Sequence, residues 1–114
     1  SKGGLVPGLL INNYISKHKK LKHMLVIGAK SYIGDGERLE KIEIYQVPNV
    51  RNERILLVDD VADTGYTLIH IKNMLEKNGN RVMTTTIFYK ERSKIKPDLY
   101  YKKTEKWVVF PWEI

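Results

Sequence analysis

Three carboxylates lie close together in the segment 58–67, which reads VDDVADTGYT. Asp59 and Asp60 follow an apolar run, RILL, and Asp63 lies three residues further on, in a turn rich in hydroxyl side chains. Like charges at this spacing repel one another, so the segment predicts a bound group that offsets the repulsion. A sugar fits, because vicinal hydroxyls donate hydrogen bonds to carboxylates. A divalent cation also fits, because carboxylate oxygens ligate it.

The turn after the paired acids, ADTGYT, has the features of a phosphate site. It leads into a segment with helical spacing, and a helix N-terminus presents free N–H groups to an anion. Thr64 and Thr67 add hydroxyl donors, and Gly65 allows the backbone to approach closely. The sequence has no GxxxxGK[ST] pattern, so this is not a Walker loop. Acids and turn together indicate a ribose 5-phosphate site, whereas the DD pair alone would suit an ordinary acidic turn.

The elements that must position this segment predict an α/β fold. A continuous apolar strand begins near residue 54, and a β-branched strand covers 81–89. Between them, one face of a helix is marked by Leu68, Ile71, Met74 and Leu75, and Gly79 ends this helix. This order is a βαβ unit, which places its two strands in parallel.

Upstream, a glycine loop runs into a helix that ends in a lysine-rich stretch near Lys20. A strand is predicted at about 22–30, a polar loop at 31–40, and a strand at 41–47 that ends at Pro48. The tail, 94–114, holds short extended pieces.

The composition excludes several classes of protein. The 114 residues suit a single domain, and 42% hydrophobic with 29% charged residues is typical of a globular chain. There is no cysteine to form a disulfide or a thiolate zinc site. No apolar run approaches the roughly 18 residues of a membrane span, and no signal peptide is present, so a cytoplasmic protein is predicted. The net charge of +7 favours polyanionic or highly phosphorylated partners.

The sequence ILLVDDVADTGYT resembles the phosphoribosyl pyrophosphate (PRPP) signature of the type I phosphoribosyltransferases, and the whole chain is similar to their 6-oxopurine branch. The resemblance implies a mostly parallel, twisted sheet flanked by helices, with a core over about 1–90 and a purine-recognising hood over about 91–114. Family members carry a helix and a strand before the first loop, so we expect this sequence to lack them.

The resemblance also implies roles for individual residues. PRPP and its ribose 5-phosphate would contact Asp59, Asp60, Ala62, Asp63, Thr64, Gly65, Tyr66 and Thr67. The segments SKGGLVPG and SYIGDGE resemble the pyrophosphate loop and the mobile catalytic loop, which implies pyrophosphate contacts from Ser1, Lys2, Gly3, Ser31 and Tyr32. The segments FYKERSKIKPD and TEKWVVFPWE resemble the hood, which implies purine contacts from Lys90, Trp107, Val108 and Glu113.

The implied reaction transfers the 5-phosphoribosyl group of PRPP to N9 of a 6-oxopurine and releases pyrophosphate. Mg²⁺ would be chelated by the substrate, with Asp60 in its shell and Asp59 near it, and Asp63 would accept the proton from N7. Two simpler interpretations stay open, namely that Asp63 caps its own helix and that Trp107 is packed in the core.

A different class of function is also compatible with the sequence. Phosphoribosyltransferase-like folds serve as nucleotide-sensing regulators, and a basic chain suits nucleic acid. Retention of Lys90 and Trp107 favours an enzyme and makes nucleic acid the less favoured partner. A different acceptor base is a third alternative. The resemblance further implies a homodimer or homotetramer, and the sequence does not choose among hypoxanthine, guanine and xanthine.

Overall fold

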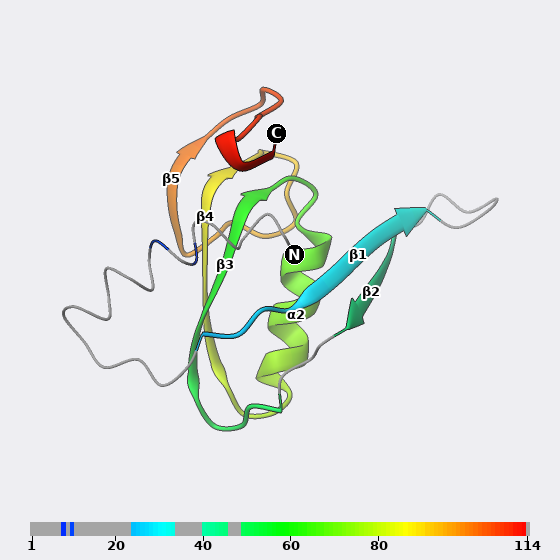
Figure 1. Ribbon diagram of the computed structural model, residues 1–114, viewed down its shortest axis with the longest axis vertical. Helices are drawn as coiled ribbons and strands as arrows, with labels where there is room; N and C mark the ends of the chain where they lie inside the picture. Colours follow the sequence, from blue (N-terminus) through cyan, green and yellow to red (C-terminus); the bar gives the residue numbers. More distant parts are fainter. Residues whose placement is uncertain (1–7, 9, 11–23, 34–39, 46–48, 114) are drawn as a thin grey trace.

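The computed structural model describes residues 8, 10, 24–33, 40–45 and 49–113. In chain order they form β1 (Gly28–Ile33), β2 (Glu40–Tyr45), β3 (Arg54–Ala62), α2 (Tyr66–Glu76), β4 (Arg81–Tyr89), β5 (Leu99–Lys103) and the 3₁₀ helix η2 (Pro111–Glu113). Strands β3, β4 and β5 make a parallel sheet, and β1 and β2 make an antiparallel hairpin beside α2 (Figure 1). The predicted α/β class is confirmed.

The predicted βαβ unit is formed by β3, α2 and β4. The two strands pair in parallel from Arg54 opposite Arg81 to Ala62 opposite Tyr89. Helix α2 buries one apolar face, made by Leu68, Ile71 and Leu75. These side chains repeat at helical spacing, so burying them fixes which side of α2 faces the core.

Helix α2 ends at Glu76, three residues before the glycine that the sequence marked as its end. Gly79 still has the left-handed conformation that reverses the chain, with φ of 80°. Asn80 then secures the turn, because its buried side-chain amide donates to the carbonyls of Leu75 at 2.9 Å and Val50 at 2.8 Å. The bond to Leu75 adds to the bond that the N–H of Asn78 already donates to the same helix-end carbonyl at 3.1 Å.

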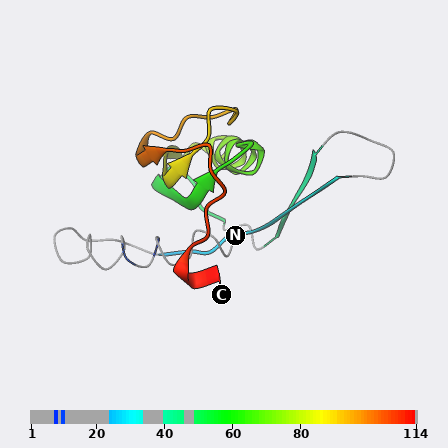
Figure 2. The same ribbon diagram turned by 90° about the horizontal axis from the view of Figure 1, so that it is seen from above.

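The sheet carries α2 on one face and the C-terminal segment with η2 on the other (Figure 2). Phe110 is buried there, with its ring 5.9 Å from Phe88 of β4 and stacked at 4.7 Å on Trp112. Trp112 is therefore a packing residue. Trp107, in contrast, is 81% exposed, so the interpretation that it belongs to the core is wrong.

The first half of the chain differs from its predicted elements. Residues 24–27 have no regular structure, and the strand begins at Gly28 instead of near Lys22. The apolar run that suggested an earlier strand is not buried, since Leu25 is 54% and Val26 49% exposed. Pairing with β2 fixes the strand instead, because 28–33 lie opposite 40–45 residue for residue.

The hairpin also corrects the predicted loop at 31–40. Ser31 pairs with Ile42 and Tyr32 with Lys41 in the antiparallel ladder, so both belong to β1. Residues 34–39 lie outside the described part of the chain, as does the predicted N-terminal helix apart from Gly8 and Leu10, which are helical. Within the described residues, no helix combines the length and apolar character needed to cross a membrane.

Candidate active site

The paired acids lie inside β3, whereas the sequence suggested that they follow the end of the strand. Strand β3 continues through Ala62, which pairs with the last residue of β4, Tyr89. Consecutive strand residues alternate between the two faces, so the Cβ atoms of Asp59 and Asp60 point to different sides of the sheet. Each carboxylate accepts the next backbone N–H, that of Asp60 at 2.9 Å and that of Val61 at 2.7 Å.

Burial in the sheet perturbs the first of these acids. Desolvation, and then the charge of Asp60, raises the pKa of Asp59 from its ordinary value of 3.8 to about 7. The ionised form is therefore costly without a cation or a hydrogen-bond donor beside it. Among the described residues, no group of three potential metal ligands exists.

Replacing Asp59 by asparagine is expected to stabilise the free protein at neutral pH. A carboxyl whose pKa is higher in the folded state contributes stability at low pH and loses it as pH rises from about 4 to about 7. A side-chain amide has no such proton to lose, so Asp59→Asn should raise the melting temperature by a few degrees at about pH 8. Thermal unfolding should show this gain shrinking toward pH 4. A gain of equal size at both pH values would contradict the raised pKa.

The turn between β3 and α2 leaves a helix N-terminus open. Gly65 occupies the N-cap position with φ of 82° and has no side chain to cap the helix, and among the described residues the only side-chain bond to the first turn is a long one, from the N–H of Tyr66 to Oγ1 of Thr64 at 3.5 Å. The interpretation of Asp63 as a helix cap is therefore wrong. The first intrahelical bond runs from the N–H of Ile69 to the carbonyl of Gly65 at 3.0 Å. The N–H groups of the first turn, with the half-buried hydroxyl side chain of Thr67, can therefore receive an anion.

A second loop packs against this turn and explains the glycine. A Cβ atom on Gly65 would lie 2.4 Å from Oγ of Ser93 and 3.0 Å from the backbone nitrogen of Lys94. That nitrogen donates to the carbonyl of Thr64 at 2.7 Å. The sequence suggested that Gly65 allows a ligand to approach the backbone closely. In the structure the loop at Ser93 and Lys94 makes this close approach and holds the turn in position.

Acid, base and aromatic side chains meet just beyond the ends of β3 and β4. Asp63 and Lys90 each follow the last paired residue of their strand, and Lys90 Nζ lies 3.4 Å from Asp63 Oδ1. Arg92 Nε donates to the same oxygen at 2.7 Å. Lys90 also lies over the Trp107 ring, 5.8 Å from its centroid. Three residues that the sequence singled out separately therefore form one contiguous group.

This group is unevenly exposed to solvent. The Lys90 side chain is 13% exposed, against 36% for Asp63 and 61% for Arg92. An ion pair as exposed as that between Asp63 and Arg92 contributes at most about 1 kcal/mol to stability. It can therefore open at little cost when a ligand reaches Asp63, while Lys90 stays fixed between the acid and the aromatic ring.

The remaining predicted residues are placed less completely. Val108 is half-buried next to Trp107, and Glu113 lies in η2. Ser1, Lys2 and Gly3 lie outside the described residues, and Ser31 and Tyr32 belong to β1 as noted above. Sequence reasoning missed Arg92. The available signal was topological, because loops that follow neighbouring parallel strands meet at one edge of the sheet.

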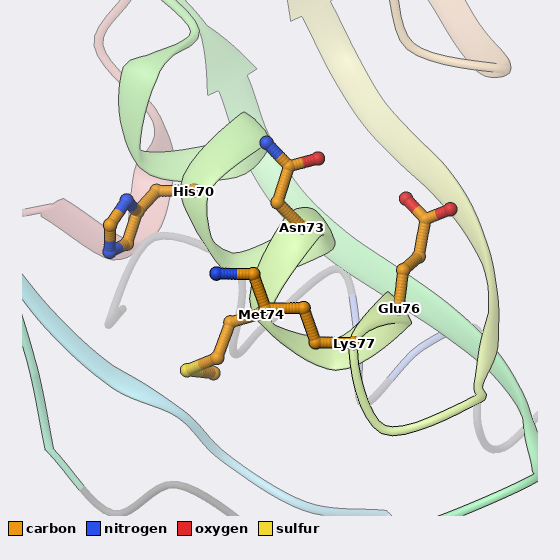
Figure 3. A pocket seen from close by; sticks show the side chains of 5 residues that line it. All are labelled: His70, Asn73, Met74, Glu76 and Lys77. Carbon is orange, nitrogen blue, oxygen red and sulfur yellow. The ribbon is translucent and has the colours of Figure 1, made fainter.

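A separate hollow of about 640 Å³ lies along α2, away from this group. It is lined by His70, Asn73, Met74, Glu76 and Lys77. Figure 3 shows that all five side chains project from the middle and the C-terminal end of the helix. The acids and the anion-binding turn lie at the opposite end of α2, so this hollow is not the site of the chemistry.

The parallel α/β sheet carries acids on one strand, a helix N-terminus directly after it and a lysine beside an aromatic ring. These groups lie at the carboxyl edge of the sheet, where α/β proteins bind their ligands. The family model described as the phosphoribosyl transferase domain matches residues 3–114. The chain belongs to this family, and it is a phosphoribosyl-transferring enzyme.

Solved structures agree with this assignment. A purine phosphoribosyltransferase from Pyrococcus horikoshii is 34% identical, with a TM-score of 0.81, and the match covers 96% of this chain and 72% of that one. The xanthine-guanine-hypoxanthine phosphoribosyltransferase of Helicobacter pylori is 23% identical, with a TM-score of 0.69 over 93% of this chain and 70% of its own. A hypoxanthine phosphoribosyltransferase from Staphylococcus aureus is 20% identical, with a TM-score of 0.71 over 91% and 58%. The last two bear on the fold alone.

Proposed function

We propose that the chain transfers the 5-phosphoribosyl group of PRPP to N9 of a 6-oxopurine, releasing pyrophosphate, as a step of purine salvage. The observation that carries this proposal is the contact of Asp63, Lys90 and Trp107 at the carboxyl edge of the sheet. A proton acceptor, a hydrogen-bond donor and a stacking surface are the three groups that a purine nucleophile needs. The name of the similar Pyrococcus horikoshii enzyme supports a purine as the acceptor.

Recognition of the base follows from the chemistry of Lys90 and Trp107. The lysine ammonium has only hydrogen-bond donors, so it can bond to the 6-oxygen of hypoxanthine or guanine, which is an acceptor. It cannot bond in this way to the 6-amino group of adenine, which is a donor. The exposed Trp107 ring offers a face on which a purine can stack, worth about 1–3 kcal/mol. Val108, and Glu113 in η2, follow Trp107 along the chain and would complete the edge of the base site.

The sugar phosphate would occupy the turn and the end of β3. The first-turn N–H groups of α2, with Thr64 and Thr67, receive the 5-phosphate, while Ala62, Gly65 and Tyr66 shape the backbone around it. Asp59 and Asp60 would accept the ribose hydroxyls with the sugar lying across the end of β3, since their Cβ atoms point to different sides of the sheet. Mg²⁺ chelated by PRPP would be held with help from Asp60 and would supply charge neutralisation for the departing pyrophosphate. The pyrophosphate is proposed to contact Ser1, Lys2, Gly3, Ser31 and Tyr32.

Asp63 would then act on the purine itself. Its carboxylate lies at the edge shared with Lys90, where it can accept the N7 proton as N9 attacks the sugar. Arg92, its exposed partner, would be displaced when the base enters. No observation on the described residues favours the alternative of a nucleic-acid-binding regulator.

Removing the Lys90 side chain should weaken the choice of base. Lys90→Ala should lower the ratio of kcat/KM for hypoxanthine to that for adenine by about 10-fold or more, because a charge-assisted hydrogen bond to the 6-oxygen is worth about 1.5–3 kcal/mol. Steady-state assays of pyrophosphate release with both bases measure this ratio. Lys94→Ala is the matched control, since that side chain is exposed and lies four residues away. An unchanged ratio in Lys90→Ala would remove Lys90 from base recognition.

A further inference from the structure

Thr86 holds a buried hydroxyl that the fold leaves without a partner. It lies in β4 with 5% exposure, and its Oγ1 makes no hydrogen bond to any residue that the structure describes. Thr84, two residues earlier on the same strand, is buried as well, but its Oγ1 donates to Asp98 at 3.1 Å. An unsatisfied buried hydroxyl costs about 1–3 kcal/mol, and a valine would fit the same space without that cost. The described part of the free protein therefore supplies no partner for this hydroxyl, and a ligand-bound state can be expected to supply one.

The residue opposite Thr86 on the neighbouring strand is Asp59. Paired residues of a parallel ladder project to the same face, so the hydroxyl and the carboxyl lie side by side on one face of the sheet. Asp59 uses Oδ1 to accept the N–H of Asp60 at 2.9 Å. Besides this bond and an interaction with the neighbouring Asp60 carboxyl, Asp59 has no hydrogen-bond donor among the residues that the structure describes. Within the described part of the chain, the Thr86 hydroxyl, which has no acceptor, thus lies beside the Asp59 carboxyl, which receives no hydrogen bond from a hydroxyl or a basic side chain.

We propose that Thr86 is a positioning residue whose hydroxyl donates to the Asp59 carboxylate when that carboxylate accepts the ribose hydroxyls of PRPP. The ladder fixes both backbones, so the bond needs only rotation of the Asp59 carboxyl and of the Thr86 hydroxyl. It would hold the carboxylate in one orientation and offset part of the cost of its ionised form. The inference rests on the function proposed above, because it gives Asp59 a sugar to bind.

A pair of conservative variants separates the hydroxyl from the methyl group. Thr86→Val keeps the shape and removes the donor, and it should raise the Kd and KM for PRPP by about 10-fold with less effect on kcat. Its melting temperature should not fall, because no bonded group is lost in the free protein. Thr86→Ser keeps the donor and should retain the KM for PRPP, although the lost methyl group lowers the melting temperature. Thr85→Val, buried on the opposite face of the same strand, should leave the KM unchanged.

Calorimetric binding of Mg-PRPP and steady-state kinetics on the three variants decide the question. An unchanged affinity in Thr86→Val, or equal losses in Thr86→Val and Thr86→Ser, would overturn the positioning role. Failure of the proposed function is distinct, since it would appear as wild-type protein that binds Mg-PRPP but forms no nucleotide. In that case the binding comparison alone still supports or overturns the role of Thr86.

Discussion

Replacing Asp63 by asparagine is expected to lower kcat for phosphoribosyl transfer by about 10²–10⁴-fold, the usual contribution of a positioned proton acceptor. Asparagine has nearly the same shape and can still accept a hydrogen bond from Arg92, so the turn should keep its structure. It cannot accept the purine N7 proton. Steady-state kinetics with hypoxanthine, together with calorimetric binding of Mg-PRPP, would show a large loss of rate with nearly intact PRPP affinity.

The matched control removes the exposed partner of the same carboxylate. Arg92→Ala breaks the 2.7 Å bond to Asp63 but leaves the proton acceptor in place, so its kcat should stay within a few-fold of wild type. Asp63 would not be the proton acceptor if Asp63→Asn kept most of the catalytic rate. Equal losses in both variants would instead indicate that the ion pair itself is what the turn needs.

Replacing Trp107 by alanine is the second change with a large expected effect. The ring is 81% exposed, so its loss should cost little stability, whereas stacking of a base is worth about 1–3 kcal/mol. The KM for the purine should rise by about 5–150-fold, and the KM for PRPP should change far less. Kinetics with each substrate varied in turn separate the two constants.

Val109→Ala provides a control for the Trp107 variant. Val109 is 66% exposed and lies two residues further along the same segment, so it tests whether truncating an exposed side chain there is harmful in general. It should leave both Michaelis constants unchanged. Equal rises of the purine and PRPP constants in Trp107→Ala would contradict a specific role of the ring in binding the purine.

The central βαβ unit could be predicted from the sequence because its signals are local. The strand 81–89 has the predicted bounds, and Leu68, Ile71 and Leu75 form most of the buried face that the spacing indicated. Met74, the fourth residue of the predicted face, is only half-buried and lines the hollow along α2. The sequence predicted too early an end for β3, because two adjacent carboxylates are typical of a turn. The ladder with β4 instead carries Asp59 and Asp60 inside the strand. Burial is the main cause of the raised pKa of Asp59, and the repulsion from Asp60 that the sequence predicted is the second cause.

Features that depend on contacts between distant segments were harder to predict. The strand in the first half begins at Gly28 because β2 is its partner, and an apolar run alone did not reveal that register. Arg92 meets Asp63 across 29 residues of sequence, and the Gly65 turn is packed by Ser93 and Lys94. The periodicity of apolar residues carries no information on contacts between distant loops. The rule that loops following neighbouring parallel strands lie at the same edge of the sheet does predict such contacts.

The most direct test of the account is to incubate the chain with Mg²⁺, PRPP and one base at a time, using hypoxanthine, guanine, xanthine, adenine and uracil. Nucleotide and pyrophosphate are then quantified together. We expect equal amounts of a purine 5′-monophosphate and pyrophosphate with at least one 6-oxopurine, and a rate at least about 10-fold lower with adenine. Folded protein that forms no nucleotide from any 6-oxopurine, or that prefers adenine or uracil, would contradict the proposed function.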